Sequence, residues 1–334
     1  MTQNEACKIF YLRQAADNPE IYRFKISSAA GNTYVISSEN ELLIIDPPIR
    51  SEEDCKIFSF AAKSMIETHT VIKLFFTHAH EMDFSLITQY FLSCSAVYIG
   101  KNENIPTEKE NPLQYQNQKY LHEGYPKEVL AQWDAHTEVP LLEDECIEFT
   151  QVSEGDLIKL GNYRLQCIDT PGHTSGHMCL WLKEKGILFS GDMFLYEMLP
   201  CVGIWDETDN EIEIMLNSLA RLKQYPIQKV FPSHGSDEGD FIKRLEEIER
   251  QFYVRILHMY RLVYDYPAKN AYDLCEYFYQ NSNNWDEALP QKKWHAMGEA
   301  LTFLNYLRNK KYVAVKQSKH GLVNIPGKNK LTDY

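Results

Sequence analysis

Four short segments rich in histidine and aspartate each follow an apolar stretch typical of a β-strand, or end one, and this layout constrains the fold most. In chain order they read FFTHAHEMDF, DTPGHTSGH, ILFSGDMF and VFPSHGSDE. Strand ends project side chains toward a common rim, where sites on sheet folds form. Imidazole and carboxylate are ligands that suit zinc, iron and manganese. The sequence therefore predicts a metal site that draws on the residues of these segments: His78, His80, Asp83, His173, His177, Asp192 and His234.

Residues 1–240 alternate between short apolar strands and amphipathic helices, which predicts a layered α/β core. We expect strands at 32–38, 41–48, 72–77, 163–168, 177–182, 186–190 and 229–231, and helices at 51–67 and 211–222. Residues 101–145 are polar and contain four prolines, with a helical piece near 126–135. Long insertions of this kind often act as lids over a site, so we expect a lid-like insertion, the alternative being a surface loop.

Beyond residue 240 the pattern becomes mainly helical, with helices expected at 241–264, 271–280 and 291–308. Two strand-like pieces at 311–323 follow, and helices with such a ribbon suggest a winged-helix-like arrangement. The chain carries a net charge of −13, whereas residues 241–334 hold 15 basic and 10 acidic residues. We therefore expect two domains, 1–240 and 241–334.

Composition narrows the function classes. No apolar run approaches the ~18 residues of a membrane span, and the sequence MTQNEACKIF does not resemble a signal peptide. The eight cysteines form no CxxC pair, which favours reduced thiols in a cytoplasmic protein. We thus expect no membrane partner.

The order HxHxxD, TPGHTSGH, SGD and SHG resembles that of the metallo-β-lactamase fold superfamily, and its glyoxalase II-like hydrolases above all. The C-terminal segment resembles that of a branch that includes a mitochondrial β-lactamase-like endoribonuclease. The resemblance implies a four-layer αββα fold followed by the helical, winged-helix-like domain. It poorly specifies the substrate, because this fold carries many chemistries.

By the same resemblance, His78, His80 and His173 would hold a first metal ion, Asp192 would bridge two ions, and His234 would belong to a second site. The chain departs from the family pattern at Met82, where an aspartate ligand is usual, and at Asp83, where a histidine is usual. Thioether sulfur is a poor ligand for hard cations. Three alternatives stay open: a weak second ion, a different metal, or Asp83 acting in place of the missing ligand. The expected cofactor is zinc, one or two ions, with iron or manganese as alternatives.

Several neighbours of the predicted ligands are candidates for supporting roles. Asp46 matches the family position beneath the histidines, or else forms a turn before Pro47. Thr77 and Ser190 precede predicted ligands and are candidates to bond their backbone. His177 matches a position that does not bind metal. Cys201 and Trp205 are expected either to line the pocket or simply to pack. Tyr115, Tyr120 and Tyr125 are expected either to contact substrate or to form a separate hydrophobic cluster.

These residues predict a hydrolase in which a metal-bound hydroxide attacks a small ester, thioester or lactone, with Asp83 and Asp192 as catalytic residues. A nuclease or phosphodiesterase is the first alternative, because seven cations and no acid lie between residues 308 and 330 and could bind nucleic acid. An iron-dependent oxidoreductase and a non-catalytic binding protein are the others. The expected partner is a small-molecule substrate, with a homodimer as an open alternative.

Overall fold

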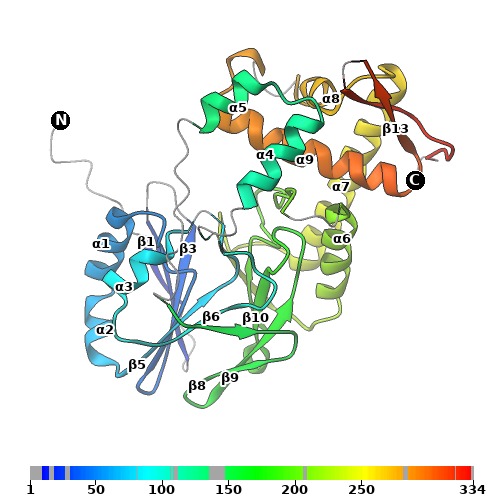
Figure 1. Ribbon diagram of the computed structural model, residues 1–334. Helices are drawn as coiled ribbons and strands as arrows, with labels where there is room; N and C mark the ends of the chain where they lie inside the picture. The colour runs from blue at the N-terminus through cyan, green and yellow to red at the C-terminus, as the bar shows by residue number, and fades with distance from the viewer. Residues whose placement is uncertain are drawn as a thin grey trace.

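The computed structural model describes residues 10–14, 19–26, 31–80, 82–105, 107, 112–134, 147–205, 209–280, 285–319 and 321–331. Two sheets lie side by side in the lower half of the molecule, and a helical body lies above them (Figure 1). The first sheet has the order β1-β2-β3-β4-β5-β6-β7. Its strands are β1 (Phe10–Gln14), β2 (Glu20–Lys25), β3 (Asn32–Ser38), β4 (Glu41–Ile45), β5 (Val71–Phe76), β6 (Cys94–Gly100) and β7 (Phe149–Val152).

Pairing within this sheet changes direction halfway. Strands β1 to β4 pair antiparallel, whereas β4 to β7 pair parallel. The parallel half is reached through helical crossovers: α1 (Glu52–Ala61) and α2 (Lys63–Thr68) join β4 to β5, and η1 (Phe84–Leu86) with α3 (Ile87–Tyr90) joins β5 to β6. Ser51 begins α1 because its side chain accepts a hydrogen bond from the Asp54 backbone N–H at 3.1 Å.

The second sheet has the order β12-β11-β10-β9-β8. Its strands are β8 (Leu157–Leu160), β9 (Tyr163–Asp169), β10 (Met178–Leu182), β11 (Ile187–Gly191) and β12 (Lys229–Pro232). Only β11 and β12 pair parallel, and α6 (Glu211–Leu222) connects them. The apolar stripe predicted for 211–222 is buried, from Ile212 to Leu222.

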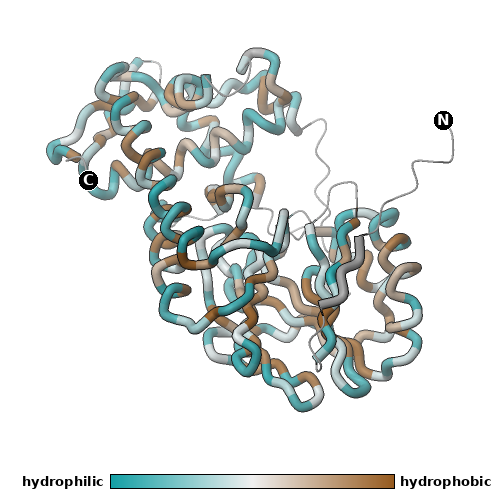
Figure 2. Tube along the Cα trace, turned by 180° about the vertical axis from the view of Figure 1, so that it is seen from behind, coloured by the Kyte–Doolittle hydropathy of each residue, from teal (hydrophilic) through white to brown (hydrophobic). Residues whose placement is uncertain are grey.

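Alternating side chains of the strands divide the apolar interior into layers. In β4, Leu43 and Ile45 point into the core shared by both sheets, while Leu42 and Ile44 point into the core under α1 and α3. A third core lies between the second sheet and helices α6 and α7. Helix, sheet, sheet and helix are therefore stacked in four layers, as predicted. Figure 2 shows hydrophobic and hydrophilic residues alternating along the helices, as each covers a core with one face.

The helical body contains the three helices expected after residue 240 and two from the expected insertion. The helices after residue 240 are α7 (Phe241–Asp265), α8 (Ala271–Tyr279) and α9 (Pro290–Asn309), with the short 3-10 helix η3 (Trp285–Glu287) between α8 and α9. The helices of the insertion are α4 (Pro112–His122) and α5 (Lys127–Asp134). The hairpin β13 (Val313–Ser318) and β14 (Gly321–Pro326) follows α9, as predicted, and η2 (Lys183–Lys185) completes the elements. The winged-helix assignment and the boundary near residue 240 stay predictions.

The described part of the insertion packs against the C-terminal helices (Figure 1). Trp133 of α5 stacks on Trp294 of α9 with ring centroids 5.3 Å apart, and Trp294 Nε1 donates to Asn117 Oδ1 at 2.8 Å. Tyr120 and Tyr125 are buried in the same core. Of the two roles left open for these tyrosines, the structure thus shows the hydrophobic cluster. The end of that insertion, from residue 135 on, lies outside the described residues.

Two cations of the basic C-terminal run are already paired within the chain. The Arg308 guanidinium bonds both carboxylate oxygens of Glu123, at 2.7 and 2.8 Å, and Lys310 bonds Glu213 at 2.8 Å. These charges fix the helical body instead of forming a free phosphate-binding surface. Among the described helices, none is long and apolar enough to span a membrane.

Candidate metal centre

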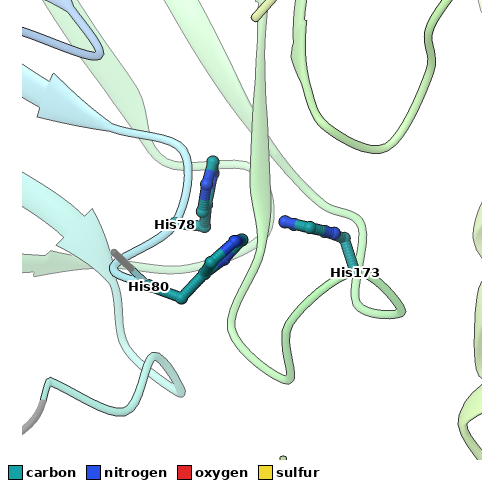
Figure 3. Close-up of side chains that lie close together, drawn as sticks. All are labelled: His78, His80 and His173. Carbon is teal, nitrogen blue, oxygen red and sulfur yellow. The ribbon is translucent and has the colours of Figure 1, made fainter. Parts of the chain in front are cut away.

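Three histidines converge where the strands of the two sheets end (Figure 3). His78 and His80 follow β5, and His173 lies in the loop between β9 and β10. One candidate ligand atom from each ring lies within 4.8 Å of the other two. The centroids of His78 and His173 are 4.9 Å apart and those of His80 and His173 are 4.5 Å apart. Metal binding by these three residues is thus supported by their geometry.

Hydrogen bonds on the opposite ring nitrogens determine which atoms face the cluster. The Cys201 carbonyl oxygen lies 2.9 Å from His173 Nδ1, and a carbonyl only accepts, so Nδ1 carries the proton and Nε2 keeps a lone pair. Thr77 Oγ1 lies 2.9 Å from His78 Nδ1 in the same arrangement. A carbonyl or hydroxyl partner that fixes the tautomer in this way is typical of metal-binding histidines.

The remaining polar atoms test whether these residues fit a metal ion. His78 Nε2, His80 Nδ1, His173 Nε2 and Asp192 Oδ1 are buried and have no hydrogen-bond partner within the part of the chain described. Buried polar atoms are almost always paired, so four such atoms at one point need an explanation. Burial lowers the pKa of His78 and of His80 well below the usual range, which keeps both rings neutral. Neutral imidazole is the form that binds zinc, so the residues fit the ion.

Asp192, which follows β11, and His234, which follows β12, join the same cluster. Asp192 Oδ2 lies 3.6 Å from His173 Nε2 and 3.4 Å from His234 Nε2. Burial acts to raise the pKa of Asp192, but the hydrogen bond with His234 and the surrounding histidines outweigh it and hold this pKa well below its usual range. The carboxylate is therefore ionised between the histidine triad and His234.

Asp46 supports both sides of the cluster. Its Oδ1 accepts the Thr77 backbone N–H at 2.8 Å, and its Oδ2 accepts the hydroxyls of Thr77 at 2.9 Å and Ser233 at 2.8 Å. Thr77 precedes His78 and Ser233 precedes His234, so one carboxylate positions two of the metal-facing loops. Of the two roles left open for Asp46, the structure shows the supporting one. Ser190, the other candidate, bonds the Phe194 carbonyl at 2.9 Å instead.

Glu103 is a supporting residue that the sequence did not point to. Its Oε1 accepts the backbone N–H of Ala79, between His78 and His80, and its Oε2 accepts the Thr174 hydroxyl at 2.7 Å, next to His173. A Cβ on Gly176 would collide with the Glu103 backbone, so the loops meet closely. Burial raises the pKa of Glu103 to about 7. A carboxylate in a polar loop carries no signal of such contacts, which depend on how β6 lies beside the second sheet.

The other predicted neighbours occupy definite places. His177 bonds Thr170 Oγ1 at 2.8 Å through Nδ1 and accepts the Asp192 backbone N–H at 3.2 Å through Nε2, so both its nitrogens are used structurally, as expected. The Trp205 ring stacks on His80 with centroids 5.2 Å apart. Trp205 also lines a cavity of about 310 Å³ together with Thr174 and Glu211. Pocket lining is therefore confirmed for Trp205, while Cys201 contributes its carbonyl oxygen.

The carboxylate of Asp83 makes local hydrogen bonds away from the histidine triad. Its Oδ1 accepts the backbone N–H of Ser85 at 3.1 Å and the Ser85 hydroxyl at 2.5 Å, which caps η1. A short carboxylate before a helical turn readily makes these local bonds. The structure brings His78, His80, His173, Asp192 and His234 together, but it brings Met82 rather than Asp83 to the cavity beside them. The ligand and catalytic roles predicted for Asp83 have no support in this placement.

The comparisons with known proteins agree with this geometry. Residues 117–234 match the family model described as the metallo-beta-lactamase superfamily. Two solved structures share the fold across nearly the whole chain, helical body included. A metallo-beta-lactamase family protein from Thermus thermophilus has a TM-score of 0.72 at 20% identity, covering 95% of this chain and 98% of that one. A beta-lactamase domain protein from Burkholderia ambifaria has a TM-score of 0.70 at 18% identity, covering 95% of each. The chain thus has the metallo-beta-lactamase fold, and residues 117–234 match the model of that superfamily.

Curated relatives match shorter stretches. The beta-lactamase-like protein 2 homolog of Caenorhabditis elegans is 26% identical over 184 residues, 55% of each chain. The probable polyketide biosynthesis zinc-dependent hydrolase PksB of Bacillus subtilis is 34% identical over 112 residues, 32% of this chain and 48% of that protein. A hydroxyacylglutathione hydrolase of Chelativorans sp. is 34% identical over 80 residues, 24% of this chain and 29% of that protein. The chain therefore spans about half or less of the length of these relatives.

Proposed function

We propose that this protein is a zinc-dependent hydrolase of a small ester, thioester or lactone, with a thioester as the first substrate to test. The observation that carries the proposal is the triad of His78, His80 and His173 beside Asp192, in which each ring has a buried nitrogen with no hydrogen-bond partner among the described residues. Relatives named as a hydroxyacylglutathione hydrolase and a zinc-dependent hydrolase support the choice of metal and of substrate class.

A bound zinc ion would supply an acidified water and polarise the substrate carbonyl. The chain itself would hold that ion through His78 Nε2, His80 Nδ1 and His173 Nε2. The ionised Asp192 carboxylate, between His173 and His234, is placed to accept a proton from an attacking water or to orient it. Because water is the nucleophile in this proposal, the reaction requires no serine or cysteine nucleophile.

The cavity next to His173 supplies a place for the substrate. It is lined by Asn102, Thr174, Trp205, Glu211 and Ile214, and its volume of about 310 Å³ lies in the range of small-ligand pockets. Trp205 forms the wall nearest to the triad, because its ring stacks on His80. An apolar acyl group against Trp205 would direct its carbonyl toward the histidines.

The test combines metal analysis with activity. Protein purified without added metal is analysed by plasma mass spectrometry, and hydrolysis of a hydroxyacyl glutathione thioester and of simple esters and lactones is followed before and after chelation. We expect zinc, and activity that chelation abolishes and zinc restores. His78→Ala and His173→Ala should each lose the metal, whereas His122→Ala, an exposed histidine of α4, should keep it. Full metal content in both triad variants would contradict the ligand assignment, and iron in place of zinc would contradict the choice of metal.

A further inference from the structure

The cavity beside the histidine triad, where a second ion would bind, is partly lined by side chains that are poor ligands for zinc. This small cavity of about 30 Å³ adjoins His78 and His234, and Met82 and Arg50 line it. Met82 is only 6% exposed and packs into the apolar core under α1 and α3. The side chain at this point is therefore fixed by core packing and offers a thioether, which suits soft metals rather than zinc in a nitrogen and oxygen site.

Few donors remain for a second ion among the residues described. His234 Nε2 and Asp192 Oδ2 face this side at 3.4 Å from each other. The carboxylate of Asp46, which also lines the cavity, already accepts three hydrogen bonds from Thr77 and Ser233. Asp83 caps η1 instead. A protein zinc site normally uses three or four side-chain ligands, and on this side the described residues provide two.

A backbone hydrogen bond of Asp83 helps to position Arg50 beside the same cavity. The Asp83 N–H donates to the Ile49 carbonyl at 2.8 Å, which holds the turn after β4 against the loop that carries His80. Arg50 follows Ile49 in that turn and lines the cavity with His78 and His234.

The cavity wall also carries the carboxylates of Asp46 and Asp54, both buried. Buried carboxylates need a positive charge nearby, and a guanidinium is charged at every physiological pH. A divalent ion placed in the same cavity would lie next to that guanidinium and be repelled by it. The positive charge of Arg50 therefore balances the negative charge of the nearby carboxylates, as a second ion does in a two-ion centre.

We propose that this protein has a single-ion centre, in which Arg50 and Met82 replace the second ion and one of its ligands. The centre is then the histidine triad with Asp192, and Arg50 is a positioning residue that lines the adjoining cavity with His78 and His234. This inference rests on the proposed function only in taking the triad as the metal site, and the two have separate tests.

Stoichiometry is the direct test. Full-length protein is dialysed against excess zinc, freed of loosely bound ion, and measured by plasma mass spectrometry, with isothermal titration of zinc into the metal-free protein as a second measurement. We expect one zinc ion for each wild-type chain. Two tightly bound ions would overturn the inference while leaving the hydrolase proposal intact. One ion without hydrolysis of any thioester, ester or lactone would overturn the hydrolase proposal and leave this inference standing.

Substitutions at Asp83, Met82 and Arg50 test which residues prevent the binding of a second ion. Asp83→Asn keeps an oxygen that can cap η1, so we expect its stoichiometry to equal that of the wild type; loss of an ion would instead show that Asp83 is a ligand. Met82→Asp adds a carboxylate but retains Arg50, and should bind a second ion weakly. Met82→Asp combined with Arg50→Met should bind that second ion tighter by on the order of tenfold, while Arg50→Lys in place of Arg50→Met should not. Equal second-ion affinity in the Met and Lys combinations would refute the role of Arg50.

Discussion

Replacing Thr77 by valine removes one buried hydroxyl from the support of the metal centre and keeps the shape of the side chain. Thr77 is fully buried, and its hydroxyl donates to Asp46 Oδ2 at 2.9 Å while it accepts from His78 Nδ1 at 2.9 Å. In the valine variant the Asp46 carboxylate keeps the Thr77 backbone N–H and the Ser233 hydroxyl, so the main loss falls on His78.

The magnitude follows from the tautomer of His78. Metal binding through Nε2 requires the proton on Nδ1, and in the variant that buried N–H has no acceptor, which costs about 1–3 kcal/mol. In the metal-free variant either ring nitrogen can carry the proton, whereas zinc fixes it on Nδ1, so the penalty appears in the binding of metal. Loss of a partner that orients a metal-binding histidine lowers affinity about 10–100-fold, and this corresponds to about 1.4–2.8 kcal/mol. The two estimates agree.

The assay is a competition titration of zinc against a chromophoric chelator, with circular dichroism to check folding. Thr77→Ser keeps the hydroxyl and should retain most of the affinity. Thr302→Val removes another buried threonine hydroxyl, one that donates to the Glu299 carbonyl in α9, and should leave zinc affinity unchanged. A folded Thr77→Val protein with the zinc affinity of the wild type would refute the reasoning.

Three further predictions test the surroundings of the site. In metal-free protein, burial raises the pKa of Glu103 from 4.5 to about 7, so the folded state binds the proton more tightly and stability is lost as pH rises through that interval. Glu103→Gln should remove this component from the pH dependence of urea unfolding, and an unchanged profile would exclude the contribution of Glu103. Trp205→Ala removes the ring stacked on His80, and kcat/KM for a hydrolysed thioester should fall roughly 2–10-fold with zinc content unchanged, whereas loss of zinc would show that the ring supports the metal instead. Arg308→Met leaves the Glu123 carboxylate buried without its bidentate partner and should destabilise the protein by about 3–5 kcal/mol in denaturant titration; Arg308→Met with Glu123→Gln should recover part of this, and no recovery would mean that the loss lies outside the pair.

The metal-facing residues were predictable from the sequence because each lies just after an apolar strand. A strand that ends before His78 or His173 brings the next side chains to the rim, whatever the loop lengths between strands. The four layers were predictable for a related reason, since alternating apolar residues in β4 require a core on each face.

Some side-chain positions depend on contacts that the sequence pattern does not reveal. The tyrosines of the insertion pack under α9 because Trp294 and Trp133 complete their core, and a lid would have shown the same composition. Asp83 was predicted as a ligand from its spacing after His80, but the local bonds to Ser85 turn its carboxylate into a helix cap. Spacing places a residue near a site, whereas the nearest donors determine where its side chain points.

The loop that runs from Cys201 to Trp205 connects the helical body to the histidine triad. Within it the Cys201 carbonyl fixes the His173 tautomer and the Trp205 ring covers His80. The same loop is held from the other side, because Gln116 of α4 donates its side-chain N–H to the Ile204 carbonyl. Helix α4 in turn packs on α9, so the position of two predicted zinc ligands depends on residues far along the chain. The helical body is therefore part of the structure that orients the metal centre, and the sheets alone would leave His173 without its fixed partner.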